Sequence, residues 1–105
     1  MTTTKTRLHT VSRTQGNNRA VKEGRIGLPD FDLEFEEVPV LVHAFRRMVR
    51  EMAYDVCEMA LTTYICAKAH GVKFTALPIF LVRDFHHGAI LHHVPSGLKS
   101  PADLA

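Results

Sequence analysis

The segment "RDFHHGAILHHV", residues 83–94, holds the densest group of side chains in this chain that could do chemistry. It contains four of the seven histidines, His86, His87, His92 and His93, just after Arg83. Imidazole nitrogens bind zinc or iron at about 2 Å, so this density first suggests a metal centre.

The expected local structure argues against one shared ion. Residues 88–94 are apolar and typical of a β-strand, in which neighbouring side chains point to opposite faces. His86 and His87 then diverge, and the same-face pair His87 and His93 lies roughly 20 Å apart. We therefore expect no metal site built from the four histidines, while a site that uses one of them with ligands from elsewhere stays open.

Arg83 and His87 suit a different chemistry at the turn that enters this strand. The planar guanidinium of Arg83 matches a carboxylate, and the imidazole of His87 can exchange a proton near neutral pH. The turn is therefore a candidate carboxylate-binding site, although His87 could equally end the strand with no role in binding.

Alternating strands and helices must position these residues. Strands are expected at residues 7–12, 31–38, 54–59, 74–82 and 88–94, and helices at residues 17–24, 39–52 and 61–71. The helix 39–52 is the clearest, because its apolar residues recur every three or four positions opposite a face of arginines. This order predicts one α/β domain with a mainly parallel sheet and flanking helices.

Ligands of an open parallel sheet bind at the carboxyl ends of its strands. The donor-rich loop after the first strand supplies Arg13 as a candidate substrate-binding residue, and Glu58 follows the third strand. Thr62 and Thr63 lie in the next helix's first turn, where free N–H groups and hydroxyls favour an anion. An alternative that the sequence supports equally well is that both threonines face solvent or the preceding carbonyls.

Composition narrows the class of protein. The net charge is +2 and no Lys/Arg run exceeds two residues, which argues against nucleic acid or a membrane surface as partner. No apolar run has the length of a membrane span or a signal peptide. Cys57 and Cys66 lack metal-ligand spacing, so we expect two buried thiols in a reducing compartment and a cytoplasmic protein.

The end of the chain suggests truncation. Ser100, Pro101 and Asp103 are typical of a helix start, yet the sequence stops at Ala105. We therefore expect residues 1–105 to form a single partial domain.

Several segments together resemble a known enzyme family. "EGRI", "DFDLEFEEV", "FRRMVREMAYDVCEMALTTYICAKAHG", "FTALPIFLVRDFHHGAI" and "SGLKSPADL" are similar to the N-terminal part of the 4,5-dihydroxyphthalate decarboxylase family. The most specific match is Tyr54 to Tyr64, where the family has "FDVxEMSLSSY". The family's "P-x-F-x-x-R-x-F-R-H-S-A-I" is matched by Pro78, Phe80, Arg83, Phe85, His87, Ala89 and Ile90.

Departures from the family pattern concern the pocket. Serines of the family are replaced by Ala60, Thr62 and Thr63, and the second arginine of its R-x-F-R-H segment is His86. Gly88 replaces a further serine. The pocket is therefore expected to be less positive than in the family.

The resemblance, which covers residues 13–104, implies an incomplete first lobe of a type II periplasmic-binding-protein-like fold. It implies a carboxy-lyase that removes carbon dioxide from a dihydroxylated aromatic diacid in phthalate degradation, with no cofactor or metal. Arg83, with Thr62 and Thr63, would hold a carboxylate and His87 would engage the phenol. Glu58 would donate the proton or orient Arg83.

The same fold also serves solute capture, so a solute-binding lobe for a small carboxylate or aromatic ligand is the alternative. The expected partners are a small aromatic carboxylate and either a missing C-terminal lobe or a second copy of the chain. The isolated chain is expected to be inactive, because its cleft lacks the facing lobe.

Overall fold

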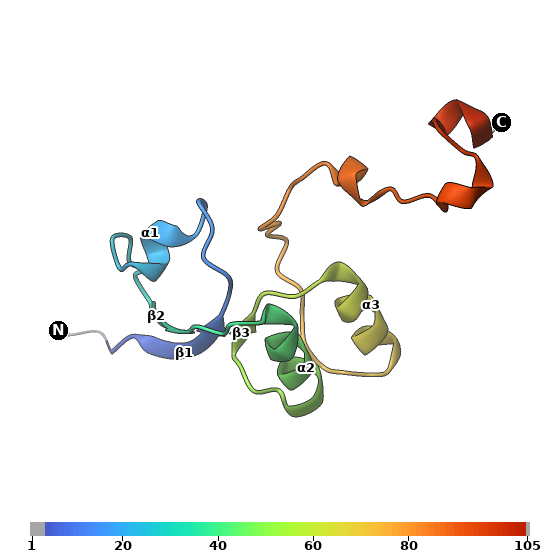
Figure 1. The fold of residues 1–105 in the computed structure, drawn as a ribbon. Coiled ribbons are helices and arrows are strands. Elements are labelled where there is room, and N and C mark those ends of the chain that lie inside the picture. The colour runs from blue at the N-terminus through green and yellow to red at the C-terminus, as the bar shows by residue number, and fades with distance from the viewer. Residues whose placement is uncertain (1–3, 105) are drawn as a thin grey trace.

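A three-stranded parallel sheet organises the first half of the chain in this computed structural model, which describes residues 4–104 (Figure 1). β1 (Thr6–Val11) lies between β2 (Phe31–Glu36) and β3 (Val56–Cys57). The register places Thr6 opposite Phe31 and Val11 opposite both Glu36 and Cys57. The expected mainly parallel sheet with flanking helices is confirmed.

Three helices follow the strands in turn. They are α1 (Arg19–Lys22), α2 (Leu41–Glu51) and α3 (Leu61–Ala69). α2 has the amphipathic pattern that the sequence predicts, and it buries Ala44, Phe45 and Met48 while its arginines stay exposed. None of the helices in residues 4–104 is long and apolar enough to cross a membrane.

The core is small and centres on the end of β1. Val11 and Ala44 are fully buried, and Met48 and Tyr54 pack with them. The side chains that border this core are only partly buried, and they are Val38, Leu41, Ala53, Cys57, Met59 and Phe74. The core therefore joins β1, α2 and the segment around β3.

A polar network ties the same elements together at Tyr54. The Tyr54 hydroxyl lies 2.7 Å from Arg47 Nη1 and 3.2 Å from Glu36 Oε1, and Arg47 Nη1 donates to Glu36 Oε1 at 2.9 Å. His9 Nε2 is 3.0 Å from the other Glu36 oxygen. Desolvation acts to raise the pKa of Glu36, but the hydrogen bond and charge of Arg47 outweigh it and the pKa is lowered.

The two C-terminal strands predicted at 74–82 and 88–94 are wrong. Residues 75–104, here called the arm, hold only the 3₁₀ turns His86–Ala89, Val94–Ser96 and Pro101–Leu104. An apolar run becomes a strand only where a neighbouring backbone can pair with it. In the described residues the arm pairs with neither edge strand of the sheet, β2 or β3, so these runs form no strand.

The arm gives the molecule an elongated shape. Figure 1 shows it, orange to red, leaving the sheet and helices and ending well beyond them. The radius of gyration is 19.0 Å, whereas a compact chain of about 100 residues has a radius near 13 Å. The largest extent, 70 Å, is about twice the next, 34 Å. Residues 4–74, here called the body, therefore carry most of the tertiary structure.

The C-terminal end of α2 generates a first prediction. Met52 has φ 50° and ψ 44°, a left-handed conformation that costs a side-chain-bearing residue about 1–2 kcal/mol. We expect Met52→Gly to be more stable than Met52→Ala by about 1 kcal/mol in urea unfolding, because glycine adopts this conformation without strain. The alanine variant controls for the loss of the half-exposed Met52 side chain. Equal stabilities would show that the position is not strained.

The Tyr54 network generates a second prediction, on acid stability. Because the folded pKa of Glu36 lies below its ordinary value of 4.5, its contribution is present above that value and is lost as the pH falls through the folded pKa. We expect the unfolding free energy of Glu36→Gln to fall less than that of the parent between about pH 6 and about pH 3. Glu34→Gln, on the same strand but outside the Tyr54 network, is the control for the loss of a carboxylate. Parallel profiles for all three proteins would contradict the prediction.

Candidate functional site

The carboxyl ends of β1 and β3 meet at Glu58. Its Oε2 accepts hydrogen bonds from Ser12 Oγ and from the Arg13 main-chain N–H, each at 2.9 Å. Its Oε1 accepts a longer one, 3.5 Å, from Gln15 Nε2, and its own N–H donates to the Val11 carbonyl at 2.9 Å. One carboxylate therefore holds the loop after β1 against the end of β3.

Asn18 organises the same loop from the other side. Its Oδ1 accepts from the Gln15 N–H at 2.7 Å, and its Nδ2 donates to Ser12 Oγ at 2.9 Å and to the Arg13 carbonyl at 2.8 Å. Asparagine satisfies loop backbone groups in this way because its short amide carries both a donor and an acceptor. The loop is therefore cross-linked by hydrogen bonds within the protein.

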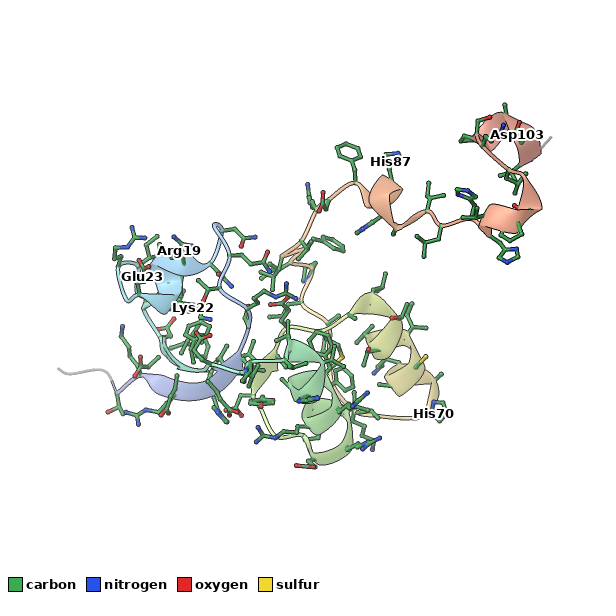
Figure 2. The ribbon with its side chains drawn as sticks, viewed as in Figure 1. Arg19, Lys22, Glu23, His70, His87 and Asp103 are labelled. Atoms are coloured by element: carbon green, nitrogen blue, oxygen red, sulfur yellow. The ribbon has the colours of Figure 1, made fainter. Side chains whose placement is uncertain are left out.

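A lysine close to this loop is already paired. Lys22, labelled on α1 in Figure 2, has a side chain that is 5% exposed, and its Nζ donates to the Ser12 carbonyl at 2.7 Å. It also forms an ion pair with Glu37 and lies 5.3 Å from the centroid of the Phe35 ring. Its charge is therefore neutralised inside the protein and is not available to an anionic ligand.

The structure brings two of the predicted site residues together, Arg13 and Glu58. They meet through the main-chain N–H of Arg13, whereas Arg13 as a residue is exposed. The arrangement thus fixes the backbone of Arg13 at the carboxyl edge of the sheet and leaves its guanidinium at the surface, where it can meet a carboxylate.

Thr62 and Thr63 lie in the first turn of α3, as predicted, and line a shallow hollow of about 390 Å³. The other residues around this hollow are mainly apolar and come from α2, α3 and the segment after it: Val49, Cys66, Ala67, His70 and Val72. The hydroxyls of the two threonines therefore stand at an apolar surface between two helices.

Arg83 and His87 lie on the arm, apart from the other predicted residues. Both are exposed, and within residues 4–104 neither side chain forms a hydrogen bond or ion pair. The His87 ring stacks on Phe85 with 5.8 Å between centroids, and Figure 2 shows His87 beyond the helices. The structure does not join them to Glu58, because the strand expected to carry them to the sheet does not form.

The four histidines do not lie on a strand. The predicted strand at 88–94, on which the argument against one shared metal ion relied, is therefore wrong. His86 and His87 begin a 3₁₀ turn, and His92 and His93 lie in the irregular segment before the next one. Across residues 4–104, no three histidine, cysteine, aspartate or glutamate side chains are grouped so that they could hold a metal ion.

The two cysteines differ in environment. Both are free thiols, but Cys66 is exposed, so the expectation of two buried thiols is wrong for it. Cys57 is half-buried and its Sγ lies 3.0 Å from the Glu58 carbonyl oxygen. Burial, with a smaller effect of the Glu58 charge, raises the pKa of Cys57 to about 12, so this thiol is a weak nucleophile at neutral pH.

Sequence reasoning identified this loop as rich in donors but did not assign roles to Ser12, Gln15, Asn18 or Lys22. The available signal was the run of hydroxyl and amide residues between a strand and a helix, which is typical of a hydrogen-bonded loop. The pairing of that run with Glu58 joins residues more than 40 positions apart.

Comparison with known proteins gives a partial match. No protein-family model matches the chain, and no solved structure is significantly similar. The chain is similar to the 4,5-dihydroxyphthalate decarboxylases of Comamonas testosteroni and Pseudomonas putida, with 38% identity to each over 61 residues, or 57% of the chain. These residues span 18% and 24% of the two enzymes, so the similarity relates the chain to about a fifth to a quarter of such a protein.

Proposed function

We propose that this chain is part of an enzyme that removes carbon dioxide from 4,5-dihydroxyphthalate or a closely similar dihydroxylated aromatic diacid. The observation that carries the proposal is the 38% identity over 61 residues to two enzymes of that name. The hydrogen-bonded carboxyl edge of the sheet, with Arg13 at its surface, supports it, because ligands of parallel sheets bind at such edges.

The reaction sets clear requirements. The bond between a ring carbon and one carboxylate breaks, its electron pair stays on the ring carbon, and a proton takes the place of the departing carbon dioxide. The second carboxylate and both hydroxyls remain in the product, so no oxidant or reductant is needed. A cation must hold the spectator carboxylate, a base must draw on the para hydroxyl, and an acid must supply the proton.

The proposed residues match two of these needs by chemical type, the cation and the base. Arg83 binds the spectator carboxylate through its planar guanidinium, assisted by the hydroxyls of Thr62 and Thr63. His87 engages the para hydroxyl, because imidazole both accepts and donates a proton near neutral pH. Arg13 adds a second cation at the sheet edge. This assignment requires the arm to lie against the carboxyl edge when the site is assembled.

Glu58 is assigned a positioning role in this proposal. Its two oxygens accept hydrogen bonds from Ser12, Arg13 and Gln15, and an acceptor so engaged is poorly placed to give a proton to a ring carbon. These contacts support Glu58 as the residue that holds the loop, and with it Arg13, in place.

The role of Arg83 can be measured by calorimetry on the purified chain. We expect the chain to bind 4,5-dihydroxyphthalate and Arg83→Ala to weaken binding about 10- to 100-fold, because a charge-assisted hydrogen bond is lost. Arg50→Ala, an exposed arginine on α2, is the matched control and should bind like the parent. Equal affinities for all three proteins would remove Arg83 from the site.

Turnover is best tested in a complete enzyme. We expect the isolated chain to release no carbon dioxide, because its matched residues span at most 24% of the relatives. A chimera in which the matched residues of this chain replace the corresponding 61 residues of the Comamonas testosteroni enzyme should decarboxylate the diacid. A chimera that is folded by circular dichroism but binds without turnover would favour the solute-binding function. A folded chimera that neither binds nor turns over would overturn the proposal.

A further inference from the structure

One side-chain hydrogen bond joins the arm to the body within residues 4–104. It runs from Asn17 Nδ2, in the loop after β1, to the Leu81 carbonyl oxygen at 3.0 Å. The two residues are 64 positions apart in the sequence, so the contact belongs to the tertiary structure and not to a local turn. Leu81 is also half-buried, whereas residues 82–97 are exposed. The arm therefore contacts the body here before it leads away from it (Figure 1).

The loop that supplies Asn17 has a fixed backbone. Glu58 accepts a hydrogen bond from the Arg13 N–H at 2.9 Å. Asn18, the neighbour of Asn17, donates to the Arg13 carbonyl at 2.8 Å and accepts from the Gln15 N–H at 2.7 Å. Asn17 therefore presents its amide from a loop that is held to the end of the sheet, four residues away from Arg13.

A tight turn in the arm presents the Leu81 carbonyl. The Ile79 N–H donates to the Leu77 carbonyl at 2.7 Å, which is the hydrogen bond of a γ-turn centred on Pro78. Proline suits the centre of such a turn, because its ring fixes φ near the required value and it has no N–H that needs a partner. The turn changes the direction of the chain shortly before Leu81. Here the Asn17–Leu81 hydrogen bond and this γ-turn are together called the latch.

The latch limits where Arg83 can lie. Arg83 follows Leu81 by two residues, so the Cα atoms of the two residues are at most about 7 Å apart. Arg13 belongs to the same loop as Asn17, so the latch brings two exposed arginines, one from the body and one from the arm, to the carboxyl edge of the sheet. This is the placement of the arm that the proposed function requires.

We propose that Asn17 is a positioning residue, whose amide joins the arm to the loop after β1 and so holds Arg83 where it can bind the spectator carboxylate of the diacid. The ligand in this inference rests on the proposed function, whereas the latch is a property of the chain itself. Asn17 acts through Arg83 and does not contact the substrate. Its removal should therefore change the position of the arm and, through Arg83, the affinity for the diacid.

The position of the arm can be measured by double electron–electron resonance between two nitroxide labels, one on Cys66 of α3 and one on Val82→Cys in the arm. Cys66 is exposed and Val82 is 59% exposed, while the half-buried Cys57 is labelled slowly. We expect a main peak in the distance distribution of the parent, and its loss in Asn17→Leu, because leucine has the shape of asparagine without the donor. Thr14→Val, at an exposed position of the same loop, is the matched control and should keep the peak.

Calorimetry with 4,5-dihydroxyphthalate separates positioning from a general effect on the loop. We expect Asn17→Leu to weaken binding about 3- to 10-fold, which corresponds to the loss of one neutral hydrogen bond, and Thr14→Val to bind like the parent. In an Arg83→Ala chain, Asn17→Leu should have no further effect, because a residue that acts through Arg83 then has nothing left to position. Circular dichroism of each variant checks that the body is folded.

Two results would overturn the proposal. The first is the same distance distribution in the parent and in Asn17→Leu, which means that the latch does not hold the arm. The second is a loss of affinity in Asn17→Leu that is equally large with and without Arg83, which means that Asn17 acts on the loop alone. A parent chain that binds no diacid would instead overturn the proposed function, and the distances would still decide whether the latch holds the arm.

Discussion

The pairing of β1 with the segment from Asp55 to Glu58 is the interaction on which the rest of the fold depends. The two-residue strand β3 is extended at both ends by side-chain and main-chain contacts. Asp55 Oδ2 accepts from the His9 N–H at 2.8 Å, the Asp55 N–H donates to the His9 carbonyl at 2.9 Å, and Glu58 binds the loop after β1 at the other end. Without these contacts α2 would lose the backbone that anchors Tyr54 against it, and the carboxyl edge would lose its loop.

The proposed site draws on two parts of the chain that differ in how firmly they are held. The body is held by a buried core and hydrogen-bonded polar groups, so it can fix the backbone of Arg13 in one position. The arm has few contacts with the body and carries Arg83 and His87 as exposed residues. A site that uses both parts therefore requires the arm to lie against the carboxyl edge of the sheet.

Local patterns in the sequence were sufficient to predict a helix or strand wherever the partner of that segment lies close along the chain. The alternation in Phe31–Glu36 and the three- and four-residue spacing in Leu41–Glu51 predicted β2 and α2 to within a few residues. The apolar run at 74–82 misled, because such a run reports that a segment would be stable in a sheet and not that a neighbouring strand exists. The site contacts of Glu58 were equally hidden, since no periodic pattern reports a carboxylate whose partners lie more than 40 residues away.

Because the two cysteines differ in burial, their labelling rates can report local opening of the sheet. Cys66 is exposed, so an alkylating reagent can reach it while the protein is folded. Cys57 lies half-buried on β3 beside the Glu58 carbonyl, so it is labelled quickly only when β3 separates from β1. The ratio of the two labelling rates then follows how often the sheet opens at its carboxyl edge, with no probe added to the sequence.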